Sequence, residues 1–92
     1  MFADILTFAP YFRNGLLFFP EKTISALMEV GLDRHIGHRA ANGLSLDDNE
    51  SLEQLTCAID ALLSRVDSTS PFFTALTSDE AYFMLTGKPV TR

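Results

Sequence analysis

The stretch NESLEQLTCAIDALLSRV, residues 49–66, is the longest amphipathic pattern in the chain. Its large aliphatic residues recur at spacings of three and four, which gathers them on one side of a helix. These residues are Leu52, Leu55, Ile59, Leu62, Leu63 and Val66. The acidic residues gather on the opposite side. The pattern therefore predicts a central helix with one buried side and one exposed, negatively charged side.

Caps, prolines and glycines divide the remaining chain into short segments. Asp33 is a good N-cap for one helix, and Ser70-Pro71 combines a cap with a first-position proline for another. Gly37 lies inside the helix that Asp33 opens and weakens it by about 1 kcal/mol relative to alanine. The predicted helices are 3–13, 20–30, 33–41, 49–66, 71–76 and 78–86, followed by a tail at 87–92.

The first nineteen residues fit two structures. A helix over 3–13 has the right spacing of apolar residues, whereas Asn14-Gly15 is a strong signal for a β-hairpin turn. We expect the helix, because Pro10 interrupts the first strand and a lone two-stranded hairpin is poorly stable. The predicted fold is a single all-α domain over 1–92, with five or six short helices around the central one. The alternative is an α+β fold with an N-terminal β-hairpin.

The aromatic residues fall into two groups at the two ends of the chain, with none between residues 20 and 71. Aromatic contacts contribute strongly to small cores, so we expect the two terminal segments to pack together over the central helix.

Charge and hydrophobicity point to a protein partner. The 92 residues carry a net charge of −5, which argues against an ordinary nucleic-acid binder with a basic footprint. Residues 44–80 hold eight acidic residues and only Arg65 as a base, so their net charge is −7. A basic surface on another protein would suit this segment. The 47% hydrophobic content is high for a short monomer and favours a homodimer or an obligate partner.

No targeting or membrane-spanning segment is expected. Asp4 and Arg13 interrupt the apolar N-terminal stretch, and no apolar run approaches the length of about 20 residues that spans a bilayer. Cys57 is the only cysteine, which excludes an internal disulfide and fits a reducing compartment. We therefore expect a cytoplasmic protein.

The sequence contains no recognisable catalytic or metal-binding motif. His35-x-x-His38 places two imidazoles on one side of a helix, but two ligands are too few for a structural zinc site. Acidic neighbours disfavour the thiolate of Cys57. We expect no enzymatic activity, no metal and no cofactor.

Three surfaces are candidates for a partner. The acidic stripe of the central helix consists of Glu50, Glu53, Asp60 and Asp67. An apolar interface for a partner or a second copy consists of Tyr82, Phe83, Met84 and Leu85. The basic face, which could contact an anion, consists of Arg34, His38 and Arg39.

The leading hypothesis is a small interaction protein, of the kind encoded by phages or mobile elements, that acts as inhibitor, adaptor or chaperone of another protein. The alternative is a nucleic-acid-associated regulator that uses the basic face. A helix-turn-helix reader is conceivable from the short helices, but the acidic segment after Gly43 would repel phosphate.

Overall fold

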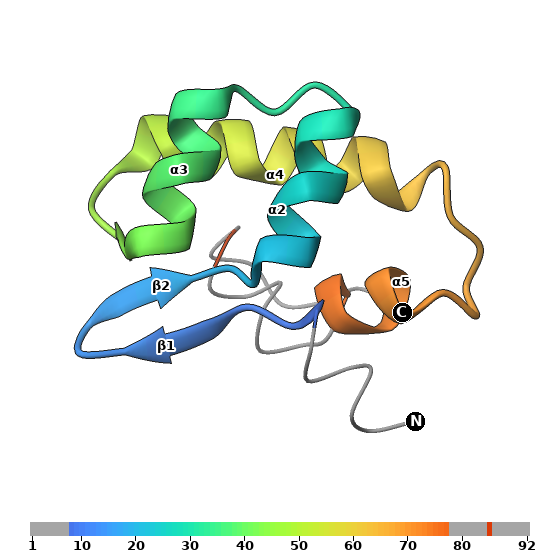
Figure 1. Ribbon diagram of the computed structural model, residues 1–92, viewed down its shortest axis with the longest axis horizontal. Coiled ribbons are helices and arrows are strands. Elements are labelled where there is room, and N and C mark those ends of the chain that lie inside the picture. Colours follow the sequence, from blue (N-terminus) through green and yellow to red (C-terminus); the bar gives the residue numbers. More distant parts are fainter. Residues whose placement is uncertain (1–7, 78–84, 86–92) are drawn as a thin grey trace.

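The computed structural model describes residues 8–77 and Leu85, and these residues form an α+β fold (Figure 1). In chain order the elements are β1 (Tyr11–Arg13), β2 (Leu16–Phe18), α2 (Glu21–Glu29), α3 (Arg34–Asn42), β3 (Leu44–Ser45), α4 (Asn49–Leu63) and α5 (Pro71–Leu76). The strands make one antiparallel sheet in the order β1-β2-β3. The prediction of an all-α bundle is therefore wrong, and the alternative with an N-terminal hairpin agrees with the structure.

The hairpin β1-β2 overturns the predicted helix over 3–13. Asn14 and Gly15 both have positive φ angles, 54° and 79°, as the two central residues of a type I′ turn require. Pro10 precedes β1, so it does not interrupt the ladder of hydrogen bonds. The pairing of β2 with β3 and the helices beside the sheet supply the support that an isolated hairpin lacks. Residues 1–7 lie outside the described residues.

The middle of the sheet contributes to the hydrophobic core. Leu17 on β2 pairs with Leu44 on β3, and both side chains are buried. The backbone N–H of Phe19, also buried, donates to the carbonyl of Ala40 at 3.0 Å. This bond attaches the end of β2 to the last turn of α3.

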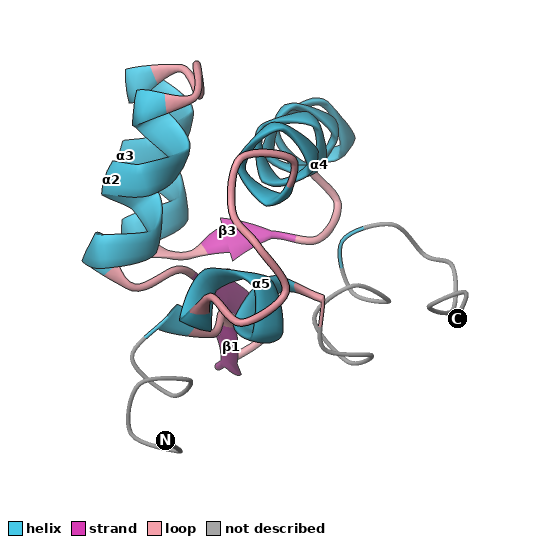
Figure 2. Cartoon of the chain, turned by 90° about the vertical axis from the view of Figure 1, so that its right-hand side faces the viewer, coloured by secondary structure: helices cyan, strands magenta, loops and turns pink. Residues whose placement is uncertain are grey.

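Helices α2 and α3 lie side by side as an antiparallel pair on one side of the molecule, with α4 on the other side (Figures 1 and 2). Asp33 caps α3 as predicted, and its carboxylate accepts from the N–H of His35 at 3.1 Å. A Cβ at Gly37 would lie 3.2 Å from both Ile24 Cγ2 and Met28 Sδ. The glycine that weakens an isolated α3 therefore lets α2 and α3 pack closely.

The central helix α4 begins at Asn49 and ends at Leu63, three residues before the predicted end. The carboxylate of Asp48 caps it by accepting from the N–H of Ser51 at 3.1 Å. Its buried side consists of Ser51, Leu52, Leu55, Ala58, Ile59 and Leu62. This side packs against α2 and α5.

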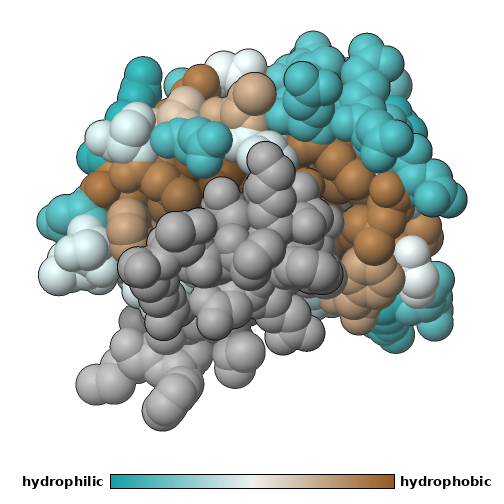
Figure 3. All heavy atoms as spheres, turned by 180° about the vertical axis from the view of Figure 1, so that it is seen from behind, coloured by the Kyte–Doolittle hydropathy of each residue, from teal (hydrophilic) through white to brown (hydrophobic). Residues whose placement is uncertain are grey.

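Aromatic residues from the two ends of the described chain meet, as their distribution predicts. The rings of Phe8 and Phe72 have centroids 4.4 Å apart, with the planes inclined at 45°. Phe72 lies in α5, which the predicted cap Ser70 and Pro71 open. Viewed from behind, hydrophobic side chains form a band across the molecule, and hydrophilic ones border it (Figure 3).

Candidate functional site

The exposed side of α3 carries only basic and neutral polar side chains. Its exposed residues are Arg34, His35, His38, Arg39 and Asn42. Its buried residues are Ile36, Gly37 and Ala40. At 3.6 residues per turn the exposed positions occupy less than half of the helix circumference. The sequence RHIGHRAAN contains no acidic residue, so this side of the helix has no carboxylate of its own.

Local hydrogen bonds fix the last turn of this surface. The side-chain amide of Asn42 donates to the carbonyl of His38 at 2.8 Å. The same Nδ2 atom lies 3.4 Å from Nε2 of the His38 ring. The imidazole of His38 is therefore oriented by its neighbour one turn later.

Arg39 is held by the start of α4. Its guanidinium forms an ion pair with Asp48 and donates to the hydroxyl of Ser51 at 3.2 Å. Asp48 also accepts from the Ser51 hydroxyl at 2.9 Å. The N–H and hydroxyl of Ser51, with a smaller contribution from Arg39, hold the pKa of Asp48 below its ordinary value. Arg39 therefore offers only part of its charge to an external ligand, although its side chain is 45% exposed.

Among the described residues, Arg34 is the arginine of the basic face that forms no ion pair. It stands at the start of α3, next to a groove of about 410 Å³ between α2 and α3. The groove is lined by Glu21, Ile24, Ser25 and Met28 of α2 and by Arg34, Gly37, His38 and Ala41 of α3. The structure therefore joins Arg34 and His38 of the predicted basic face in one concave surface, while Arg39 lies outside it.

Sequence reasoning missed the α2 side of this groove. Ser25 and Met28 of α2 both line the groove, and the Met28 side chain is 39% exposed, but neither residue belongs to a surface predicted from the sequence. The signal that could have identified the groove is Gly37. A glycine in the middle of a short helix often marks a close approach of another element.

The acidic stripe lies on a different helix and extends beyond its end. Glu50, Glu53 and Asp60 are exposed on the outer side of α4, opposite its buried side. Asp67 lies in the loop after α4 and accepts from the N–H of Thr69 at 3.0 Å. The hydroxyl and N–H of Thr69 hold the pKa of Asp67 below its ordinary value.

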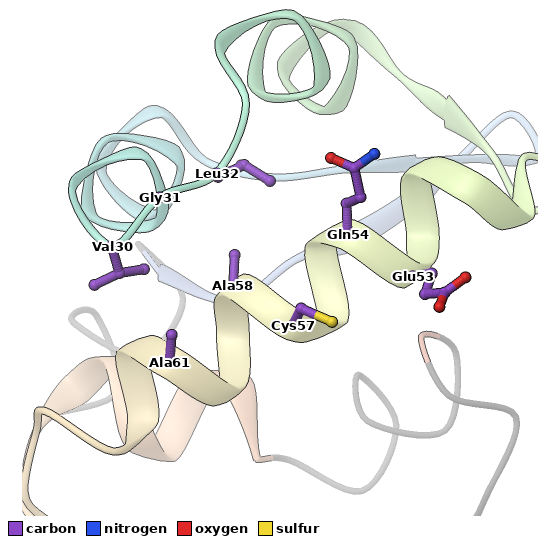
Figure 4. A pocket seen from close by; sticks show the side chains of 8 residues that line it. All are labelled: Val30, Gly31, Leu32, Glu53, Gln54, Cys57, Ala58 and Ala61. Atoms are coloured by element: carbon purple, nitrogen blue, oxygen red, sulfur yellow. The ribbon is translucent and has the colours of Figure 1, made fainter.

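A second pocket, of about 300 Å³, lies between α4 and the turn that joins α2 to α3 (Figure 4). It is lined by Val30, Gly31, Leu32, Glu53, Gln54, Cys57, Ala58 and Ala61. Cys57 is a free, exposed thiol at the rim of this pocket. Glu53 is the charged residue among those that line the pocket, and the others are small or neutral. The pocket therefore offers few charged contacts to a ligand.

The predicted apolar interface near the C-terminus falls mostly outside the described residues, as does the predicted helix over 78–86. Tyr82, Phe83 and Met84 belong to that part, so the interface stays a prediction for them. Leu85 is described, and its side chain is only 9% exposed in the hydrophobic core of this chain. Leu85 therefore stabilises the fold and presents little surface to a partner.

Neither a metal cluster nor a membrane-spanning helix is found over residues 8–77. No three His, Cys, Asp or Glu side chains of the described chain gather closely enough to hold a metal ion. None of the described helices combines the length and the hydrophobicity that crossing a bilayer requires.

Comparison with known proteins gives no relative from which a function could be transferred. No protein-family model matches the sequence, and neither a curated protein nor a solved structure shows significant similarity to the chain.

Proposed function

We propose that the protein is a cytoplasmic, nucleic-acid-associated regulator that contacts phosphates through the basic face of α3, without catalytic activity. The observation that carries this proposal is the composition of the exposed side of α3. Two arginines, two histidines and one asparagine occupy it, with no acid among them. Arginine and histidine donate to phosphate oxygens, and asparagine also reads base edges.

The charge distribution supports one orientation of binding. The acids that give residues 44–80 their net charge of −7 include the acidic stripe on α4. Helix α4 lies on the opposite side of the molecule from α3 (Figure 2). A polyanion is therefore repelled from the α4 side and approaches the α3 side. Because few cations are involved, the binding is weak and sensitive to salt.

The mode of contact differs from that of a helix-turn-helix protein. In that motif the two helices cross at about 90–120° and the second enters the major groove. Here α2 and α3 run side by side in opposite directions (Figure 1). The proposed contact is therefore the exposed side of α3 against a phosphate backbone.

A gel shift at low salt, with DNA and RNA probes, tests the proposal. The Arg34→Ala variant removes the arginine that forms no ion pair with a described residue, and it should lose most of the binding. The matched control is Arg65→Ala, which removes an exposed arginine from the turn after α4 and should bind like the wild type. If the wild-type protein retards no probe, the proposal fails.

A second candidate function is binding of a protein partner by the acidic stripe, as inhibitor, adaptor or chaperone. The specific observation is that Glu50, Glu53 and Asp60 form no ion pair with a described residue and so remain available to a basic surface. The double variant Glu53→Lys, Asp60→Lys separates the two functions. Capture of a partner from the native host, identified by mass spectrometry, should be lost with this variant, whereas binding of nucleic acid should be retained or strengthened.

A further inference from the structure

We propose that the groove between α2 and α3 holds one unpaired nucleotide of a single-stranded nucleic acid, with its phosphate at Arg34 and its base toward Glu21. This inference rests on the proposed function and names the form of nucleic acid that the basic face takes.

The chemistry of the groove changes along its length. Because α2 and α3 are antiparallel, the end of α2 lies beside the start of α3 and the start of α2 beside the end of α3 (Figure 1). Arg34 and Met28 therefore line one end, and Glu21 and Ala41 line the other. A ligand that fits needs an anionic group at the first end and a hydrogen-bond donor at the second.

The middle of the groove is suited to a flat, partly apolar group. Ile24 lies between the two ends, and Met28 and Ala41 add apolar surface on either side of it. Gly37 is buried beneath the groove, where it lets Ile24 and Met28 pack against α3. The imidazole of His38 lies on the same wall, and histidine and arginine planes stack on unpaired bases. A nucleotide combines these three requirements, since it carries a phosphate, a flat base and, in three of the common bases, an exocyclic amino group.

The acids of α2 disfavour a duplex in the same position. Glu21 and Glu29 are both exposed on α2, the helix that packs against α3, and Glu21 lines the groove between the two helices. If α3 entered a major groove, these carboxylates would meet the phosphates of the groove wall. A single strand avoids this repulsion, because its one backbone can follow the α3 side while the base turns toward α2.

The carboxylate of Glu21 predicts a preference among bases. A carboxylate accepts from the amino group of cytosine but is repelled by the oxygen that uracil has in the same place. We expect oligo(dC) of about ten nucleotides to bind about tenfold more tightly than oligo(dU) of equal length. Fluorescence anisotropy at low salt measures both affinities.

Two variants test the groove without altering the cations of α3. Ala41→Met fills the groove with an apolar side chain and should weaken binding of oligo(dC) about tenfold, while non-specific binding of duplex DNA is unchanged. Glu21→Gln should abolish the preference for oligo(dC). Its matched control, Glu29→Gln, removes an equal charge from α2 outside the groove and should keep the preference.

The outcomes separate this inference from the proposed function. Suppose that Ala41→Met and Glu21→Gln bind both oligonucleotides like the wild type, while Arg34→Ala loses binding. The basic face then contacts nucleic acid as proposed, but the groove does not hold a nucleotide. If no single strand binds and duplex DNA does, the groove inference is overturned. Tighter binding of a phosphopeptide than of either oligonucleotide would overturn it too. If the wild type binds no nucleic acid, both fail.

Discussion

Arg39 and Asp48 form an ion pair that joins the last turn of α3 to the first turn of α4. The same carboxylate caps α4, and the same guanidinium donates to Ser51 inside that cap. The basic face and the acidic helix are thus connected through one small network. Because this network engages the guanidinium of Arg39, Arg39 has mainly a structural role. Arg34 is then the principal cation of the basic face for a ligand.

The number of phosphate contacts can be measured from the salt dependence of binding. With one full contact from Arg34 and a partial one from Arg39, we expect a slope between about −1 and −2 for log K against log salt concentration on duplex DNA, at about −0.9 per phosphate. Arg34→Ala should reduce the magnitude of the slope by about 1. Fluorescence anisotropy titrations between low and moderate salt give both values. A slope that Arg34→Ala leaves unchanged would remove this residue from the contact.

Asp48 should make stability depend on pH in the acid range. Its pKa is lower in the folded protein than its ordinary value of 3.8, so the folded state binds fewer protons than the unfolded state near that value. The stabilisation by Asp48 is therefore complete above about pH 5 and is lost as the pH falls through 3.8 toward the folded-state pKa. Urea unfolding of wild type and Asp48→Asn at several pH values should show a difference that shrinks on acidification. A difference that stays constant on acidification would contradict this role of the Asp48 carboxylate.

Gly43 should tolerate alanine less well than Gly15. Both have positive φ, 108° and 79°, but a Cβ at Gly43 would lie 3.0 Å from Leu16 Cδ1 and Phe18 Cζ, whereas a Cβ at Gly15 meets nothing within 4 Å. We expect Gly15→Ala to cost about 1 kcal/mol and Gly43→Ala about 2–3 kcal/mol of unfolding free energy. Equal costs in chemical denaturation would contradict the close packing of Gly43 against β2.

The buried side of α4 should dominate stability. Leu55 is fully buried, so Leu55→Ala should cost about 2–5 kcal/mol, a large share of the roughly 5–15 kcal/mol of a typical domain. Cys57 is two residues away and exposed, and Cys57→Ala should change stability by less than about 0.5 kcal/mol. Guanidinium unfolding of the two variants compares the two sides of the helix directly.

Periodicity and caps predicted helices α2 to α5 well because their determinants are local. The spacing of Leu52, Leu55 and Ile59 identified α4 and its buried side, and the cap Asp33 identified the start of α3. The same periodicity placed the basic residues of α3 on its exposed side.

The sheet was harder to predict because its support is not local. Asn14-Gly15 indicates a hairpin turn, but the stability of the hairpin depends on the pairing of Leu17 with Leu44, 27 positions later in the chain. No residue near β2 in the sequence indicates that β3 is its second partner strand. The groove was missed for a similar reason, since it exists only through the contact of Gly37 with Ile24 and Met28.

The lengths of the strands have a consequence for solubility. Both edges of the sheet are very short, with three residues in β1 and two in β3. An exposed edge invites another chain to pair with it, and Tyr11 and Phe12 on β1 would make such an addition apolar. Pro10 supplies no N–H donor before β1, and Arg13 brings a charge to its end. The short strands, the proline and the charge therefore all disfavour the pairing of another chain with this edge.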